Sequence, residues 1–392
     1  RLHEAAVMSG EPPLKGLKIL ELARVLAGPW IGMTLADLGA DVIKVESPEG
    51  DDTRRWGPPW VEHKGERAAA YYHACNRGKR SIVLDFRTEQ GREAVRRLAA
   101  QSDVLIENFK HGGLAKYGLD YASLKAINPR LVYCSVTGFG QTGPRADLPG
   151  YDFIVQGMAG LMDLTGEPDG RPQKVGIPIA DILTGLYGII AIQAALARRA
   201  ATGLGEHVDM ALMDAMTGVL GNQALNYLVS GTSPHRMGSS HPNIVPYQAV
   251  PCSDGYLILA VGNDGQYARL CDVLEVAALR DPRFASNAGR VEHRAELVPQ
   301  IEAATRRLSR AQLQAACDTH VIPAGPIHDV GEVFADPQIV ARGMRIDPEG
   351  VPGVKSPIRF ADAGLSLDRA SPALGEHTDA ILAEIGMTPS GD

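Results

Sequence analysis

Cysteine is scarce in this sequence, and the spacing of the few cysteines argues against several kinds of site. The chain has 392 residues and five cysteines, an odd number with no CxxC pair for zinc or a redox couple. We therefore expect reduced thiols, a cytoplasmic protein and no metal site. The cysteines are Cys75, Cys134, Cys252, Cys271 and Cys317.

The sequence also lacks an excess of positive charge and any run of 18 or more apolar residues. A formal net charge of -7 gives no electrostatic reason to expect nucleic acid or an anionic membrane as a partner. The most apolar stretch, residues 182–197, is interrupted by glycine and polar residues, so we expect a buried helix there. The opening RLHEAAVMSGEPPLKG has no apolar core for export, and we expect an expression remnant or a disordered leader.

The familiar catalytic signatures GxSxG, HExxH and GxxxxGK are absent, which removes support for the mechanisms that need them. One formal GxGxxG match consists of Gly138, Gly140 and Gly143. Pro144 and a polar run follow it, so no helix N-terminus is expected there to meet a pyrophosphate. We interpret this stretch as a tight glycine-rich turn.

Strand and helix patterns alternate in the first half of the chain. KILEL and DVIKVE read as strands around a helix that Pro29 opens, and RSIVLDF, DVLIENF and PRLVYCSVT continue the alternation with helices at 88–101 and 121–128. This order is typical of a mainly parallel sheet with helices on both faces. The fold class expected is therefore α/β, with ligands at the carboxyl ends of the strands.

The second half predicts a further long helix and a smaller inserted domain. KVGIPIA reads as a short strand before a helix at 182–201 that Gly203 and Gly205 close. QAVPC, SDG and YLILAVG then read as a hairpin, followed by helices and a terminal helix at LGEHTDAILAEIG with Thr378 as a possible cap. We expect a large domain from 15–220 plus 330–392, and a small α+β domain at 225–325.

Asp181 is the most informative single residue, because it follows the predicted strand and precedes the long helix. A carboxylate there is already ionised at neutral pH and attacks a thioester without an auxiliary base. Aspartate is also a preferred N-cap, so a purely structural role stays open on this pattern.

Four motifs resemble those of the class III CoA-transferases, a family that includes formyl-CoA transferase, carnitine CoA-transferase and α-methylacyl-CoA racemase. They are RVLAGPWIGMTLADLGADVIKVESP at 24–48, CNRGKRSIVLDFRTEQG at 75–91, DVLIENFKHGGLAKYGLD at 103–120 and GYDFIVQGMAGLM at 150–162. The similarity extends from about Lys15 to the terminal LGEHT. It implies a Rossmann-like large domain, a smaller inserted domain and an interlocked homodimer.

The resemblance also implies a mechanism and a cofactor requirement. Asp181 matches the family's nucleophile, which forms an acyl-aspartyl anhydride and then an aspartyl-CoA thioester. Coenzyme A and acyl-CoA are then substrates, and no tightly bound cofactor is expected. Such intermediates need a pocket that excludes water.

The family's CoA contacts carry over to ten positions: Leu26, Ala27, Leu84, Asp85, Phe86, Arg87, Asn108, Phe109, Lys110 and Lys116. Two positions depart from formyl-CoA transferase, since Ser47 replaces an arginine and Leu26 replaces an active-site glutamine. The resemblance therefore implies a rearranged phosphate site and an acceptor other than oxalate.

Finer matches, among them RVLAGP, DDTRRWGPP and IVPYQA, are most similar to the succinyl-CoA:glutarate branch, which favours dicarboxylate substrates. Arg24 and Arg54 are then candidates for binding the distal carboxylate, with pairing to Asp51 or Asp52 as the structural alternative. Tyr151 and Asp152 stand where the racemases have a histidine and aspartate, which favours transfer over racemisation.

The segment HPNIVPYQ, from His241 to Gln248, occupies the place of a glycine-rich loop that closes over the site in formyl-CoA transferase. Its two prolines favour a fixed wall, and His241 is either a substrate contact or polar surface. An acyl-CoA racemase and a non-catalytic acyl-CoA-binding protein remain the alternatives to a CoA-transferase.

Overall fold

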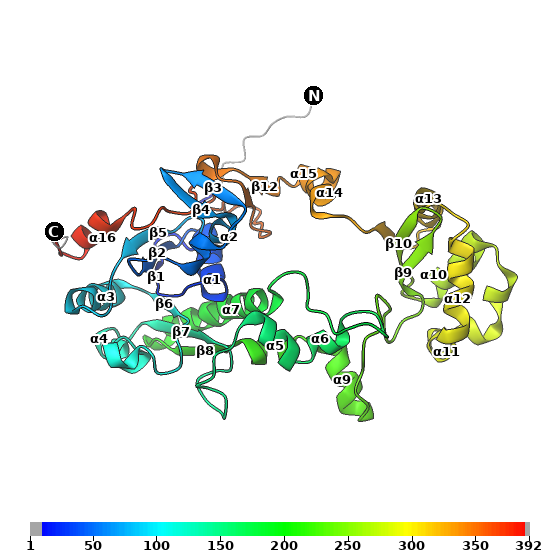
Figure 1. Ribbon diagram of the computed structural model, residues 1–392, viewed down its shortest axis with the longest axis horizontal. Helices are drawn as coiled ribbons and strands as arrows, with labels where there is room; N and C mark the ends of the chain where they lie inside the picture. Colours follow the sequence, from blue (N-terminus) through cyan, green and yellow to red (C-terminus); the bar gives the residue numbers. More distant parts are fainter. Residues whose placement is uncertain (1–9, 389–392) are drawn as a thin grey trace. The chain divides into compact units, whose positions relative to one another are not determined.

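The structure is a computed structural model, and it describes residues 10–388 (Figure 1). Residues 1–9 of the expected leader lie outside the described residues. The chain divides into two compact units, and the first comprises residues 10–161, 175–225 and 338–388. The second comprises residues 226–337 together with 162–174, a stretch that lies within the range expected for the large domain.

A six-stranded parallel sheet forms the centre of unit 1. Its strand order is β5-β2-β1-β6-β7-β8, and every neighbouring pair is parallel. The order reverses between β1 and β6, and in such sheets ligands bind at the carboxyl edge beside that reversal. The strands are β1 (Lys18–Glu21), β2 (Asp41–Glu46), β5 (Arg80–Val83), β6 (Val104–Glu107), β7 (Val132–Thr137) and β8 (His207–Ala211). The α/β expectation is confirmed.

Helices cover both faces of this sheet. The side chain of Ile19 packs in one buried cluster with α1 (Ala27–Asp37), α5 (Asp152–Met158), α7 (Ile179–Thr202) and α8 (Leu212–Gly218). Leu20, the next residue, packs in the opposite cluster with α3 (Glu89–Gln101), α4 (Tyr121–Ile127) and α16 (Thr378–Glu384). This alternation explains why the strands read as continuous apolar runs, since both of their faces are buried.

Local sequence signals account for several helix ends. The side chain of Thr88 accepts a hydrogen bond from the N–H of Gly91 and caps α3. Gly203 ends α7 in the left-handed region, at φ 76°. Helix α1 begins at Ala27, two residues before the proline that the sequence pattern takes as its start.

The structure differs from the sequence-based expectations in three places. Residues 174–180, KVGIPIA, form no strand, and α7 already begins at Ile179, so Asp181 lies inside the first turn of that helix. Strand β8 was not predicted, because HVDMA alternates only weakly between apolar and polar residues. Thr378 does not cap the terminal helix: its hydroxyl accepts the N–H of Val83 in β5 at 3.2 Å, which docks α16 on the sheet.

Helix α7 is a core helix of unit 1. It is long and apolar enough to cross a membrane by length and composition alone, with a mean hydropathy of 1.7 over 18 residues. It nevertheless packs on α1, α5 and α8 and contributes Ala180, Ile192 and Ala195 to the buried cluster. The chain therefore uses this helix as interior structure, as the sequence predicts.

Unit 2 contains the predicted hairpin, which pairs antiparallel as β9 (Tyr247–Cys252) and β10 (Gly255–Ala260), with β11 (Ala324–Pro326) beside β10. Its apolar core lies between this sheet and the surrounding helices. The helices of this unit are α10 (Asp264–Leu274), α11 (Asn287–Glu292), α12 (Arg294–Thr305), α13 (Arg310–Thr319) and α14 (Val330–Ala335).

Short elements complete the chain. They are the hairpin β3 (Trp60–His63) with β4 (Glu66–Ala69), the pair β12 (Arg345–Ile346) with β13 (Gly353–Val354), the helices α2 (Ala70–His73), α6 (Leu161–Leu164), α9 (Gly221–Ser230) and α15 (Pro337–Ala341), and the 3-10 turns η1 (Asp52–Arg55), η2 (Ala115–Tyr117), η3 (Ala277–Arg280), η4 (Pro282–Phe284) and η5 (Pro348–Gly350).

Candidate active site

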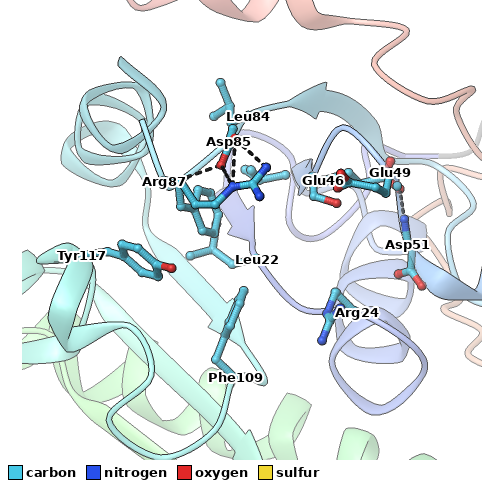
Figure 2. A pocket seen from close by; sticks show the side chains of 14 residues that line it. Leu22, Arg24, Glu46, Glu49, Asp51, Leu84, Asp85, Arg87, Phe109 and Tyr117 are labelled. Carbon is cyan, nitrogen blue, oxygen red and sulfur yellow. Dashed lines mark hydrogen bonds and ion pairs between the residues drawn. The ribbon is translucent and has the colours of Figure 1, made fainter. Parts of the chain in front are cut away.

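A cavity of about 230 Å³ lies at the carboxyl edge of the sheet, beside the reversal of strand order. It brings together five of the ten positions expected to bind CoA, namely Leu84, Asp85, Phe86, Arg87 and Phe109. Figure 2 shows Asp85 and Arg87 on one side of this cavity and Phe109 on the other. Because these residues follow β5 and β6, the parallel sheet itself gathers them.

The polar groups around this cavity are largely paired with one another. The guanidinium of Arg87 donates to both oxygens of Asp85, at 2.8 to 3.0 Å (Figure 2). Arg24 also lines the cavity and contacts Asp52 at 3.3 Å, so it has the structural partner named as the alternative. Both arginines are more than half exposed, and such pairs exchange readily for an incoming phosphate or carboxylate.

Asn108 joins the two loops that diverge at this edge. Its side-chain oxygen accepts the backbone N–H of Arg24 at 2.9 Å, and its amide donates to the Arg24 carbonyl at 2.7 Å. The carboxylate of Glu107 accepts the N–H of Phe109 at 2.8 Å and fixes the same turn. The side chain of Asn108 therefore holds loop to loop, whereas the sequence suggested a CoA contact.

Four further positions of the CoA set lie elsewhere. Leu26 and Ala27 are buried at the start of α1, each about 4% exposed. Lys110 lines a second cavity of about 280 Å³, and Lys116 is exposed, with its ammonium over the ring of Tyr117 at 4.8 Å. Of these, Lys116 contacts the ring of Tyr117, which lines the first cavity.

Asp181 lies in the first turn of α7, where the partly buried carboxylate has no hydrogen bond or ion pair to any described residue. Burial and the negative charge of Asp152 raise the pKa of Asp181 to about 7. The N-cap position of α7 is Pro178, so the capping role left open by the sequence does not apply. The carboxylate is thus available for chemistry.

Asp152 holds the start of α7 in place. One of its oxygens accepts the N–H of Ala180 at 2.7 Å and the other accepts the amide of Gln156 at 2.7 Å. Gln156 in turn accepts the N–H of Val175, which anchors the loop that leads into the helix. Tyr151, by contrast, is 66% exposed. The structure therefore gives Asp152 a supporting position beside Asp181.

Arg54 is not a surface residue, and its place in the structure corrects the expectation of a substrate contact. Its side chain is buried, and all three guanidinium nitrogens donate to groups of the protein. Two nitrogens bind the carboxylate of Glu46, the third binds Glu66, and the hydroxyl of Tyr72 and the carbonyl of Pro372 complete the set. Each of the three nitrogens is therefore engaged within the protein.

His241 belongs to unit 2 and is engaged in local structure. Its ring nitrogen accepts the N–H of Asn243 at 3.0 Å, and its carbonyl accepts from Arg294 at 2.9 Å. Further along this segment, the carbonyl of Val245 accepts from the buried Arg290 at 2.7 Å. These bonds fix the segment 241–248 to its own unit.

Two tyrosines near the site were not predicted from the sequence. Tyr117 lines the first cavity beside Phe86, with ring centroids 6.5 Å apart. Tyr71 is close enough to Asp181 to be affected by its charge. Burial and the charges of Asp181, Cys75 and Asp152 raise the pKa of Tyr71 to about 12. The only available signals in the sequence were a tyrosine next to Lys116 and the pair Tyr71 and Tyr72 shortly before Cys75.

The second cavity lies under the loop at 110–115 and contains a buried polar row. The carboxyl group of Glu107 lies beside the hydroxyl of Ser135, which contacts His207 Nε2 at 2.9 Å. Burial raises the pKa of Glu107 to about 7. Among the residues described, no group of three or more His, Cys, Asp or Glu side chains is placed to hold a metal ion.

Comparisons with known proteins agree with this geometry. The sequence pattern of CoA-transferase family III matches residues 14–378. The succinate–glutarate CoA-transferase of Agrobacterium fabrum is 57% identical over 384 residues, covering 96% of each chain. The human succinyl-CoA:glutarate CoA-transferase is 39% identical, covering 96% of this chain and 87% of its own.

Solved structures give the same result. A CAIB/BAIF family protein from Brucella suis is 64% identical and superposes with a TM-score of 0.87, covering 96% of this chain and 100% of that one. A protein of Mycobacterium tuberculosis superposes with a TM-score of 0.85 at 28% identity, covering 95% and 100%. The chain belongs to CoA-transferase family III, whose enzymes use CoA thioesters as substrates.

Proposed function

We propose that this enzyme moves CoA between dicarboxylic acids, with succinyl-CoA as a donor and glutarate as an acceptor, and that Asp181 is the nucleophile. The substrate assignment is supported by the names of the two transferases above, at 57% and 39% identity. The observation that carries the mechanism is the unpartnered carboxylate of Asp181 in the first turn of α7.

Each step of the reaction exchanges one acyl bond. The Asp181 carboxylate attacks the thioester carbonyl and expels CoA thiolate, which leaves an acyl-aspartyl anhydride. The thiolate attacks the aspartyl carbonyl of that anhydride, releases the donor acid and forms an aspartyl-CoA thioester. The acceptor carboxylate repeats the first step, and the thiolate then attacks the new acyl carbonyl and restores Asp181. The raised pKa makes the carboxylate more nucleophilic once it is ionised.

We assign CoA to the cavity at the edge of the sheet. Phe86, Phe109 and Tyr117 offer aromatic surface there, and Arg87 and Lys116 are exposed cations beside it. Three further members of the proposed CoA set support these loops from behind. Asn108 does so through its bonds to Arg24, and Leu26 and Ala27 do so through their burial.

Arg24 is our remaining candidate for the distal carboxylate of the substrate. It is exposed, it lines the cavity, and its guanidinium lies 6.0 Å from the ring centroid of Phe109. Since the same cavity contains the CoA positions, a contact to a CoA phosphate has equal support. A contact to the distal carboxylate would affect only dicarboxylic substrates, whereas a contact to a CoA phosphate would affect every acyl-CoA.

We also propose a homodimer, interlocked as the family resemblance implies. Apolar side chains on the adjoining helices α5 and α7 are exposed in the single chain, among them Phe153 at 58%, Leu186 at 42% and Ile190 at 63%. Monomeric proteins rarely expose such a patch. Sedimentation of the enzyme at falling concentration tests the assembly, and a stable folded monomer contradicts it.

Three smaller assignments accompany this function. We propose a cytoplasmic location, supported by five cysteines that form no disulfide. We propose no tightly bound cofactor. We keep residues 15–220 plus 330–392 as the CoA-binding domain and 225–325 as the small domain.

The test is a mass-spectrometric screen of purified enzyme incubated with succinyl-CoA and a panel of carboxylic acids. We expect glutaryl-CoA to form fastest among the products. Incorporation of solvent deuterium at the α-carbon of a branched acyl-CoA, without transfer, would identify a racemase. Binding of acyl-CoA with no exchange for any acid would identify a non-catalytic binding protein.

A further inference from the structure

The segment that follows β1, residues 22–25, has no regular structure, yet other segments hold its backbone, mostly through their side chains. The N–H of Leu22 donates to the carbonyl of Ile106 at 2.8 Å. The carbonyl of Ala23 accepts from the ammonium of Lys44 at 2.9 Å, and both backbone groups of Arg24 bind Asn108. Buried polar backbone is usually satisfied within helices and sheets, so this loop is unusual in depending on side chains.

Val25 is the strained residue of this segment. Its φ is 70°, in the left-handed region, which β-branched residues avoid because the branched side chain clashes with the backbone. Conformations of this kind persist only where the surrounding structure fixes them, and they are concentrated at functional sites.

Two buried side chains hold Val25 in this conformation. Its N–H donates to the carboxylate of Asp51, with the two oxygens at 3.2 and 3.3 Å. Its carbonyl accepts from the thiol of Cys75, with Sγ at 3.3 Å. Asp51 and Cys75 are 1% and 0% exposed, and they come from different parts of the chain.

The protonation states suit these bonds. Burial alone would raise the pKa of Asp51, but the ammonium of Lys44 at 2.9 Å and the N–H of Thr53 hold it below its usual value, so the carboxylate accepts. Burial raises the pKa of Cys75 to about 12, so the thiol keeps the proton that it donates. The thiol of Cys75 is therefore not ionised near neutral pH, and the carboxylate of Asp51 is occupied by Lys44, Thr53 and Val25.

The strained residue leads directly into α1, which packs against α7, the helix that contains Asp181. Helix α1 begins two residues after Val25, and a Cβ placed on Gly185 of α7 would lie 3.1 Å from the carbonyl of Ala27. Gly185 lies one turn beyond Asp181 in the same helix. The direction in which the chain leaves Val25 therefore sets how the first turn of α1 lies against the first turns of α7.

We propose that Asp51 and Cys75 are positioning residues of the transfer reaction: by holding Val25 in the left-handed conformation, they fix the start of α1 beside the turn that carries Asp181. This inference rests on the proposed role of Asp181 as the nucleophile. Neither side chain needs to touch the substrate.

The experiment measures single-turnover acylation of Asp181 by succinyl-CoA, trapped with hydroxylamine and quantified on the peptide that contains Asp181. We expect Asp51→Asn to slow acylation by roughly 10-fold or more and Cys75→Ala by roughly 3- to 10-fold, the range expected when a strained loop relaxes. For Cys75→Ala, which does not line the cavity, KM for succinyl-CoA should stay within about threefold while kcat falls.

A change at Val25 tests whether the effect passes through its backbone. In Val25→Gly the left-handed conformation is unstrained, so this variant should acylate within about threefold of wild type, and Cys75→Ala should lose most of its effect in that background. Val25→Ala keeps the Cβ and should remain sensitive to Cys75→Ala. Cys134→Ala, at a fully buried cysteine in β7, controls for the loss of a buried thiol and should not alter the acylation rate.

The outcomes separate this inference from the proposed function. If wild-type enzyme exchanges CoA but carries no label on Asp181, the nucleophile has been assigned wrongly. If wild type is labelled and Cys75→Ala is labelled equally fast, or is slowed equally in the Val25→Gly background, the positioning role is wrong. If Asp51→Asn fails to fold, the comparison of Cys75→Ala alone with Cys75→Ala in the Val25→Gly background still tests the positioning role.

Discussion

Asp152 and Asp181 are linked through the first turn of α7: Asp152 accepts the N–H of Ala180 at 2.7 Å, and its negative charge adds to the effect of burial on the neighbouring carboxylate. The same group thus fixes the position of the candidate nucleophile and opposes its ionisation. This pairing yields a pH dependence that a solvent-exposed aspartate would not show.

The first prediction concerns the rate. Since the pKa of Asp181 is raised to about 7, kcat/KM for succinyl-CoA should fall as the pH decreases through about 7, where the carboxylate becomes protonated. Asp152→Asn removes the nearby charge and should move this fall to lower pH. Glu107→Gln is the control, because burial also raises the pKa of Glu107 to about 7; if that variant shifts the profile instead, the titrating group is Glu107.

The second prediction concerns stability. A carboxyl group with a raised pKa in the folded state favours folding below its unfolded pKa, and this contribution is lost as the pH rises through about 7. Asp181→Asn should therefore raise the melting temperature by roughly 2–4 °C at pH 8, and by much less near pH 4. Thermal unfolding of both proteins across this range checks the sign; a variant less stable than wild type at pH 8 contradicts it.

The third prediction separates chemistry from helix capping. Asp181→Ala and Asp181→Asn should both lower kcat by about 10³-fold or more, because each removes the nucleophile. Both should bind CoA and keep the far-ultraviolet circular dichroism of wild type, since the cap position of α7 is Pro178. An active Asp181→Asn enzyme would show that the carboxylate is not the attacking group.

The fourth prediction compares the two arginines. Arg24→Ala should reduce transition-state binding of glutarate by roughly 2 to 4 kcal/mol while sparing a monocarboxylate of equal length. Equal losses with both acids would assign Arg24 to CoA or to structure. Arg54→Ala should instead reduce the free energy of unfolding by about 3–5 kcal/mol, because it leaves Glu46 buried without its partner. Kinetics with paired acceptors and denaturant unfolding provide the two measurements.

The sequence predicted five of the six strands of the sheet, most of its helices and the place of Asp181 along the chain, because these depend on apolar periodicity and local caps. It did not predict that Asp181 lies inside the helix. The apolar residues of KVGIPIA resemble a strand, but its single glycine and single proline, Gly176 and Pro178, disfavour strand pairing there. Arg54 and Asn108 were assigned to the site only because the motifs that contain them resemble those of the family. Their true partners, Glu46, Tyr72 and Arg24, are set by tertiary contacts that no local pattern encodes.

The docking of α16 on β5 has a consequence for how the chain reaches its native state during synthesis. Ile381 and Leu382 of that helix complete the cluster that contains Leu20 and Ile82, and Glu384 pairs with Arg80 at 2.6 Å. The strands at the start of the chain therefore lack part of the core on one face until α16 has left the ribosome. Until then, the nascent chain presents this apolar surface to chaperones, and any shortening of the chain before Thr378 should make that exposure permanent.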